Sequence, residues 1–332
     1  METIARDNHT IHDFRLSSGE ILPEATIAYV TRGNLAADGR NAVLVTHGYT
    51  SGHQMIEPDG GSSEGSWTTL VGPGAPIDTE RNFVVCSNML GSSFGSTNAA
   101  SIDPRSGRRY GSRFPKISLT DIVTAQHRLL QHLGVKHLRA VVGPSYGGFQ
   151  TFQWAVTFPD FLDAAVPVVS APRARLNMTA DTLARFQRDP NWNGGDYYDT
   201  PGGMTASMVA LRMETLGRYG MTDEAAIRRA AEQWASVFDA NSLLILGHAA
   251  EAYDITAELH RISVPMLYVL SRTDALFPPT RAPEVMAALH KAGVDATYFE
   301  IDSDKGHLAS GADAAKWAPA LRGLMRRVGV AA

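Results

Sequence analysis

Short apolar runs alternate with longer amphipathic segments through the first half of the chain. The runs have the length and the β-branched content of buried strands. They are Ala42 to Val45, Asn82 to Cys86, Leu138 to Val142 and Ala164 to Val169. Helical spacing of apolar residues is found over Thr120 to Leu133 and Phe149 to Phe158. This alternation predicts a mostly parallel sheet that is covered by helices on both faces.

The alternation stops near Pro172 and resumes after Asp254. Between them the chain is helical in pattern, is rich in Met and Arg, and has no further run of the strand kind. Its turn-rich stretch, 189–198, we interpret as a loop that anchors these helices. Strands at Val264 to Leu270 and Ala296 to Ile301 follow, with helices at Ala282 to Ala292 and Ala314 to Val328. We therefore predict a core domain of residues 1–171 and 255–332, with 172–254 inserted as a helical lid.

Composition and charge narrow the class of protein. The 332 residues are 44% hydrophobic and 19% charged, which excludes a disordered chain. A net charge of −4 and the lack of a basic run argue against nucleic-acid binding. The lone cysteine, Cys86, lies in an apolar run and is expected to be an inert core thiol. A polar N-terminus and the absence of an apolar 20-residue stretch predict a cytoplasmic protein with no membrane partner.

The segment Gly143-Pro144-Ser145-Tyr146-Gly147 follows the apolar run that ends at Val142. A strand, a sharp turn carrying a serine between glycines, and then a helix form the layout of a nucleophile elbow. We expect the serine backbone to be strained, and the neighbouring small residues to let strand and helix approach closely. Such a turn would hold the Ser145 hydroxyl above the strand ends, where a substrate can reach it.

A serine nucleophile needs a base to take its proton and a third group to orient that base. Asp274 and His307 each follow a late strand, in the order Ser, Asp, His that an elbow of this kind uses. Because parallel strands share one carboxyl edge, all three are expected to meet there. The alternatives are that Asp274 caps a helix near Pro278 and that His307 is a surface histidine.

Acyl transfer also needs donors for the tetrahedral oxyanion. The backbone N–H of Tyr146 and that of Tyr49, in the turn His47-Gly48-Tyr49, are the candidates. The alternative for His47-Gly48 is a plain tight turn. No phosphate-binding loop, HExxH segment or paired-cysteine site occurs, so we expect neither a metal nor a cofactor.

The chain resembles the homoserine O-acetyltransferase family of α/β-hydrolases over roughly residues 26–308. Beyond the elbow, the resemblance rests on the segments 88–97, 103–111 with Phe114-Pro115, 189–197 and 238–242. It implies an α/β-hydrolase core, a helical lid that often forms a homodimer, and ping-pong acetyl transfer through an acyl-serine. It also supports Ser145, Asp274 and His307 as the triad and Tyr49 and Tyr146 as oxyanion-hole positions.

Three residues of the expected substrate pocket depart from the family pattern, and a fourth, Arg212, is a possible substitute for a missing one. Ser207 is aligned with the lid arginine that holds the homoserine carboxylate, and Glu214 with a tyrosine further along. Leu308 replaces the aspartate that, in the family, follows the histidine and helps to bind the amino group. Arg212 could substitute for the missing arginine, but we interpret it as a solvated lid residue.

These departures would remove two charge-assisted contacts, each contributing roughly 1.5–3 kcal/mol. We therefore expect a serine ester hydrolase that cleaves small, short-chain acyl esters. The first alternative is a CoA-dependent O-acyltransferase with another acceptor, using acetyl-CoA or succinyl-CoA. The second, a catalytically inactive binding protein, is disfavoured by the intact Ser-Asp-His order.

Overall fold

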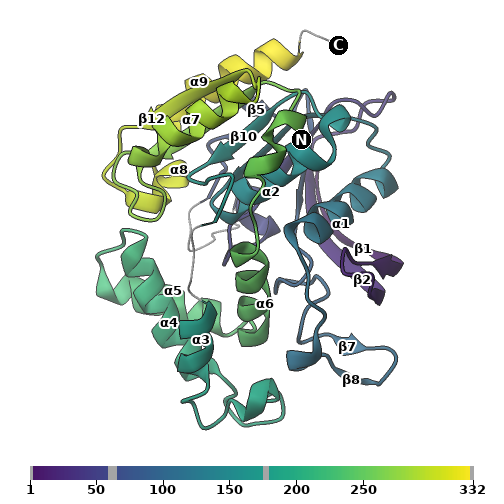
Figure 1. Cartoon of the computed structure of the whole chain (residues 1–332), viewed down its shortest axis with the longest axis vertical. Helices are drawn as coiled ribbons and strands as arrows, with labels where there is room; N and C mark the ends of the chain where they lie inside the picture. Colours follow the sequence, from purple (N-terminus) through teal and green to yellow (C-terminus); the bar gives the residue numbers. More distant parts are fainter. Residues whose placement is uncertain (1–2, 59–65, 175–178, 330–332) are drawn as a thin grey trace.

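The chain folds around one eight-stranded sheet with the strand order β1-β2-β6-β3-β9-β10-β11-β12 (Figure 1). A computed structural model describes residues 3–58, 66–174 and 179–329. The sheet strands are β1 (Ile4–Arg15), β2 (Ile21–Arg32), β3 (Ala42–Thr46), β6 (Phe83–Ser87), β9 (Leu138–Pro144), β10 (Ala165–Val168), β11 (Met266–Ser271) and β12 (Ala296–Ile301). From β6 through β12 each neighbouring pair is parallel, which confirms the predicted mostly parallel sheet.

The six strands predicted from apolar runs are all present, with ends shifted by two residues at most. The hairpin of β1 and β2, which pairs Ile4 with Arg32 and Arg15 with Ile21, was not predicted. Strand β1 lies at the sheet edge and is mostly exposed, so its sequence is polar and lacks the apolar run that marks a buried strand. Short pairs form outside the sheet between β4 (Val71–Gly72) and β5 (Ile77–Asp78), and between β7 (Ile102–Asp103) and β8 (Arg108–Arg109).

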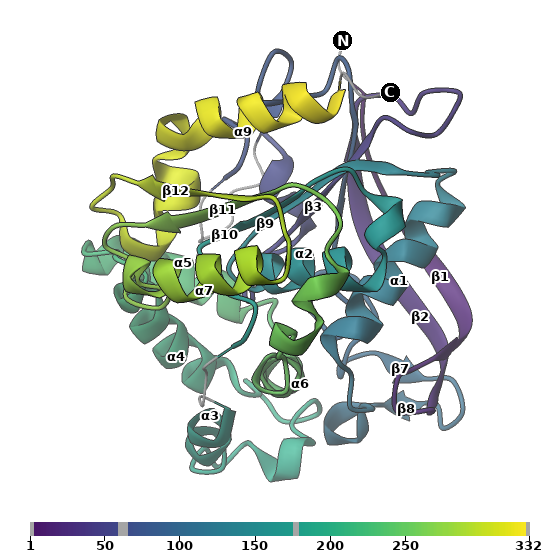
Figure 2. The ribbon, with the colours of Figure 1, turned by 45° about the horizontal axis from the view of Figure 1, so that its top comes forward.

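Helices cover both faces of the sheet (Figure 2). One face packs against α1 (Leu119–His132), α2 (Tyr146–Thr157) and α7 (Ala282–Lys291), and the other against α9 (Ala314–Gly329), which follows the short α8 (Ala309–Ala312). Within β3, Leu44 packs with the first group, while Val43 and Val45 pack with Trp317 of α9. This alternation is the period of two that a strand buried on both faces requires. Cys86 lies fully buried in β6, and burial raises the pKa of its thiol.

Among the described residues, four α-helices lie between β10 and β11 and form a separate layer beside the sheet (Figure 1). They are α3 (Thr179–Phe186), α4 (Thr205–Arg218), α5 (Glu224–Ala235) and α6 (Ala240–Glu251). Residues 175–178 of the expected lid lie outside the described residues. Two hydrogen bonds join the turn-rich stretch before α4 to the start of α6. Tyr197 Oη donates to Oδ2 of Asp239, the residue before α6 (2.6 Å), and Nδ2 of Asn241, in α6, donates to the Gly195 carbonyl (2.8 Å). Among the described residues, no helix combines the length and apolar character needed to cross a membrane.

Candidate active site

Ser145 occupies the turn between β9 and α2 with φ 57° and ψ −119°. A positive φ is rare for a residue with a side chain, so the predicted strain at the elbow is confirmed. A Cβ added to Gly143 would lie 2.0 Å from Thr46 Oγ1, and one added to Gly147 would lie 2.3 Å from the Thr46 carbonyl oxygen. Only glycine allows strand β3 to approach the elbow this closely.

Hydrogen bonds from two neighbouring strands hold the strained turn. The Ser145 N–H donates to the Val168 carbonyl (2.8 Å), and Ser170 Oγ donates to the Ser145 carbonyl (2.8 Å). Tyr268 Oη, from β11, donates in turn to the Ser170 carbonyl (2.8 Å). The backbone conformation of the serine is therefore fixed by the sheet, whichever way its side chain turns.

Asp274 and His307 meet in the fold although 33 positions separate them. His307 Nδ1 donates to Asp274 Oδ2 at 2.8 Å, and both side chains are buried. Asp274 Oδ1 also accepts the N–H groups of Leu276 (2.8 Å) and Phe277 (3.2 Å). Burial alone would raise the pKa of the Asp274 carboxyl, but the neighbouring His307 and these hydrogen bonds outweigh burial and lower it. The carboxylate can therefore orient His307 and leave Nε2 for another partner.

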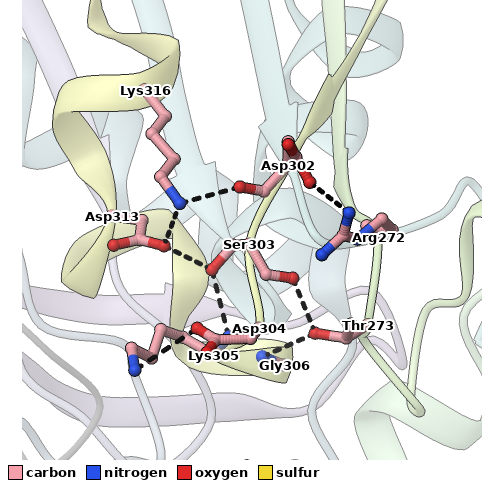
Figure 3. Close-up of polar contacts among 9 residues, drawn as sticks. All are labelled: Arg272, Thr273, Asp302, Ser303, Asp304, Lys305, Gly306, Asp313 and Lys316. Carbon is pink, nitrogen blue, oxygen red and sulfur yellow. Dashed lines mark hydrogen bonds and ion pairs between the residues drawn. The ribbon is translucent and has the colours of Figure 1, made fainter.

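A polar network ties the loop that carries Asp274 to the loop that carries His307 (Figure 3). Thr273 Oγ1 donates to the Ser303 carbonyl (2.9 Å) and accepts the Gly306 N–H (3.1 Å). Ser303 Oγ donates to Asp313 Oδ2 (2.6 Å), which also binds Lys316 Nζ (2.9 Å). The loop that precedes His307 is therefore held on one side by Asp313 with Lys316 of α9, and on the other by Thr273, which is next to Asp274.

The predicted oxyanion loop is held by His47, whose imidazole is buried. Its Nδ1 lies 2.8 Å from the Gly48 carbonyl, and its Nε2 accepts the Met89 N–H at 3.1 Å. Burial lowers the pKa of His47 to about 4, so the ring is neutral near pH 7. Gln150 Nε2, from α2, donates to the His47 carbonyl (3.0 Å) and so links this loop to the elbow helix.

The side chains of the two candidate oxyanion residues are bonded to the lid. Tyr49 Oη donates to the Leu243 carbonyl (2.5 Å), and Tyr146 Oη donates to the Leu246 carbonyl (3.1 Å), both in α6. The two rings are stacked with centroids 5.6 Å apart and an interplanar angle of 8°. Helix α6 thus rests on the same two residues whose backbone N–H groups are candidates for the oxyanion hole.

A cavity of about 210 Å³ opens beside Ser145 between the sheet edge and the lid. Ligand pockets for drug-sized molecules are about 300–1,000 Å³, so this cavity suits a smaller substrate. Its wall includes Tyr49, Thr50, Ser145, Tyr146, Phe149, Thr179, Arg185, Arg212, Glu214, Arg218, Tyr219, Trp234, Gly247, Glu251 and Phe277. His307 is not part of this wall, but its ring packs against those of two residues that are, Tyr219 (5.0 Å) and Phe277 (5.7 Å).

Arg212 is not the solvated lid residue that we expected. It is 1% exposed, and its guanidinium lies over the ring of Trp234 (5.1 Å) and near that of Tyr219 (5.8 Å). Its Nη1 donates to Thr50 Oγ1 at 2.6 Å. The long side chain of this residue crosses from α4 to the loop after β3, where it forms part of the cavity wall.

Two other residues expected in the pocket lie elsewhere. Ser207 Oγ donates to Asp189 Oδ2 (2.5 Å), and Ser207 is not part of the cavity wall. Leu308 packs beside Leu216 and Tyr219 in a small apolar cluster and is likewise outside the wall. Glu214 does line the cavity, where its Oε1 is 2.9 Å from Arg185 Nη2.

Thr179, Tyr219 and Trp234 line the cavity but were missed as site residues. The signal that could have found Tyr219 is its spacing. It follows Glu214 by the five positions that also separate Arg212 from Ser207. A single five-residue shift of the alignment would have placed both an arginine and a tyrosine in the pocket.

The sheet order, the elbow and the lidded cavity define an α/β-hydrolase-fold enzyme. The family model described as alpha/beta hydrolase fold matches residues 41–311. A homoserine O-acetyltransferase of Pelobacter propionicus is 35% identical over 333 residues, covering 90% of each chain. The chain belongs to the α/β-hydrolase family and, within it, to the homoserine O-acetyltransferase family.

Solved structures of two kinds share this fold. A homoserine O-acetyltransferase from Bacillus anthracis matches with a TM-score of 0.85 and 23% identity, covering 98% of both chains. Esterase E22 matches with a TM-score of 0.84 and 24% identity, covering 97% of this chain and 100% of that one. At this identity the structural matches establish the fold alone, and they do not separate acyl transfer from ester hydrolysis.

Proposed function

We propose that the protein is an O-acyltransferase, which moves a short acyl group through Ser145 to the hydroxyl of a small acceptor that carries a carboxylate. The observation that supports this most is the buried guanidinium of Arg212 in the cavity wall. Arginine offers five N–H donors in a planar fork that matches a carboxylate. The name of the Pelobacter relative suggests an acetyl group and homoserine. The family resemblance suggests acyl-CoA as the donor.

In the first half of the proposed reaction, Ser145 Oγ attacks the carbonyl carbon of the acyl donor. His307 takes the serine proton at Nε2, while Nδ1 stays bonded to Asp274. The backbone N–H groups of Tyr49 and Tyr146 stabilise the oxyanion. As the tetrahedral intermediate collapses, the bond to the leaving thiolate or alkoxide breaks. His307 returns the proton to the leaving group, and an acyl-serine remains.

In the second half, the acceptor hydroxyl gives its proton to His307 and attacks the acyl-serine. The same two N–H groups stabilise the second oxyanion, and Ser145 regains the proton as the new ester leaves. Arg212 holds the acceptor by its carboxylate, which places its hydroxyl at the acyl carbon in preference to water.

Ester hydrolysis, our expectation from sequence, remains the second candidate because of one observation. Leu308, next to His307, supplies no carboxylate for an acceptor's amino group and packs instead with Leu216. With a weakly held acceptor, water would take the acyl group from Ser145, and the protein would be an esterase for short-chain acyl esters.

Product partitioning distinguishes the two functions. Wild-type enzyme is given p-nitrophenyl acetate with and without millimolar homoserine, and acetate is measured against O-acetylhomoserine. The transferase proposal expects O-acetylhomoserine to become a major product and acetate to fall. Acetate alone, at a rate indifferent to homoserine, would instead establish the esterase. Acetyl-CoA then replaces the nitrophenyl ester in a second series, which tests the donor class separately.

A further inference from the structure

The end of lid helix α4 touches the loop that carries His307. A Cβ added to Gly220, two residues after α4, would lie 3.1 Å from the Lys305 carbonyl oxygen. A Cβ added to Gly306 would lie 3.0 Å from the Tyr219 carbonyl oxygen. Both distances are shorter than ordinary van der Waals contact, so the two segments meet backbone to backbone. Glycine at both positions permits this approach.

Gly220 also caps α4, and capping does not explain this contact. Its φ of 106° and the hydrogen bond from its N–H to the Gly217 carbonyl (3.1 Å) are those of a glycine that ends a helix. Gly293, after α7, has a φ of 84° and the corresponding bond to the His290 carbonyl (3.0 Å). Among the described residues, no other part of the chain lies within 4 Å of a Cβ built on Gly293. The approach to the loop before His307 is therefore additional to the cap.

An apolar cluster joins the lid to both loops of the proposed triad. It combines buried side chains of the lid with one partly buried leucine from each loop. These members are Leu216, Tyr219 and Ile227 from the lid, and Leu276 and Leu308 from the loops. Leu276 is two residues after Asp274, and Leu308 is next to His307. Apolar burial thus holds the end of α4 against the two segments that must meet for catalysis.

Tyr219 also contacts the catalytic imidazole itself. Its ring centroid is 5.0 Å from that of His307, with an angle of 45° between the planes. The Arg212 guanidinium lies 5.8 Å from the same tyrosine ring. Phe277, from the core, packs against the imidazole at 5.7 Å. His307 is therefore held by one ring of the core and by one ring of the lid.

We propose that three positioning residues, Tyr219, Gly220 and Leu308, hold the lid against the loop that carries the base. Held in this way, the lid keeps His307 where it can take the proton of Ser145. A base must lie within hydrogen-bond distance of that proton, and a displacement of about 1 Å can cost about 100-fold in rate. The inference rests on the proposed role of His307, which acyl transfer and ester hydrolysis share. It also gives Leu308 a role at the position where the family has an aspartate.

Turnover of p-nitrophenyl acetate by Gly220→Ala and Gly293→Ala enzymes tests the proposal. Both variants place alanine at a positive φ in a helix cap, but only Gly220→Ala presses on the histidine loop, which must then move by a few tenths of an ångström. We expect Gly220→Ala to lower kcat and the rate of fluorophosphonate labelling by about tenfold, with KM changed by less than about twofold. Gly293→Ala should keep both rates near those of the wild type. Urea denaturation checks that both variants are folded, because alanine at a positive φ destabilises a cap.

Variants of Leu308 test the same contact without straining the backbone. Leu308→Ala should lower kcat by about fivefold at little change in KM, because the loop loses its apolar partner in the lid. Leu308→Met keeps the apolar volume and should restore most of the rate. Leu35→Ala, which removes a partly buried leucine of the core outside the cavity wall, is the matched control and should keep the wild-type kcat.

Two results would overturn the positioning role. One is a wild-type kcat for Gly220→Ala and Leu308→Ala, and the other is an equal loss in these variants and in their controls. His307→Gln separates this role from the mechanism on which it rests. If turnover survives His307→Gln, His307 is not the base, and the proposed mechanism fails together with the positioning role. If His307→Gln abolishes turnover while the variants match their controls, the positioning role alone fails.

Discussion

The loops at the carboxyl ends of the strands and the helices of the lid line the same cavity, but they position their residues in different ways. At the sheet edge, backbone hydrogen bonds between paired strands hold Ser145, and a turn bonded from both sides holds His307. In the lid, Arg212 of α4 and Tyr219, the residue after that helix, are fixed by side-chain contacts with the rings and the hydroxyl around them. The first arrangement suits chemistry common to all acyl substrates, and the second suits recognition of one of them.

The largest expected effect would come from removing the proposed nucleophile, Ser145, at the carboxyl ends of the strands. Ser145→Ala should lower turnover of p-nitrophenyl acetate by about ten-thousandfold or more, as loss of a triad serine does elsewhere. It should also abolish labelling by a fluorophosphonate. Ser207→Ala, whose hydroxyl binds Asp189 outside the cavity wall, is the matched control and should keep near-normal turnover. Residual labelling of Ser145→Ala would show that another residue is the nucleophile.

A selective loss is expected from the lid. Arg212→Gln should raise the KM for homoserine by about 10- to 150-fold, because a charge-assisted contact with the carboxylate, contributing roughly 1.5–3 kcal/mol, is lost. The effect on acylation by p-nitrophenyl acetate, which has no carboxylate, should be at least tenfold smaller. Arg228→Gln, on the exposed face of α5, is the matched control. Equal losses with both substrates would mean that Arg212 supports the fold of the site and does not recognise the acceptor.

The contrast between residues positioned by strand pairing and residues positioned by side-chain contacts also explains what could be predicted from the sequence. Strands and the elbow were found because apolar runs and glycine spacing report directly on backbone pairing and close approach. The meeting of His307 with Asp274 was predicted from strand ends that share one edge. Strand β1 was missed because an exposed strand has no apolar run to mark it, whereas its partner β2 is largely buried and its apolar run, Ile27 to Val30, was overlooked.

The lid residues that face the cavity could not be predicted from the sequence, for a different physical reason. Which residue of α4 faces the cavity depends on how the helix is rotated, and five positions turn a helix by about 140°. An alignment error of that size put Ser207 and Glu214 where Arg212 and Tyr219 belong. Burial of a long charged side chain such as Arg212 is likewise invisible in sequence, since arginine is most often exposed. Only packing against Trp234 and Tyr219 reveals it.

A smaller effect is expected where the two regions join. Tyr146→Phe removes the hydrogen bond to the Leu246 carbonyl and so loosens α6 from the residue after the nucleophile. We expect kcat to fall by up to about tenfold and the unfolding free energy by about 1 kcal/mol. Affinity for a trifluoromethyl ketone, which mimics the oxyanion, should fall in parallel with kcat. Tyr298→Phe, whose hydroxyl binds Glu300 on β12, is the control. A stability loss with unchanged kcat and ketone affinity would leave Tyr146 Oη a purely structural role.

The smallest expected effect is on the pH dependence of the unfolding free energy, to which buried histidines of the core should contribute. Burial lowers the pKa of His47 and of His53 in the core to about 4, and the charge of Arg6 adds to the shift at His53. In the unfolded chain their pKa returns to about 6.5. Between these values the unfolded state binds more protons than the folded one, so acid favours unfolding. The unfolding free energy should therefore fall as pH drops from 6.5 to 4, by at most about 1.4 kcal/mol per pH unit for each histidine.

Urea denaturation at several pH values between 7 and 4 measures this slope. His53→Gln should remove one histidine's share of it, because the variant side chain cannot take up a proton on unfolding. His248→Gln, on the exposed side of the lid helix α6, should leave the slope as in the wild type. If the His248 variant flattens the slope and the His53 variant does not, acid sensitivity resides in the lid. Burial of His53 in the core would then not be the source of the acid sensitivity.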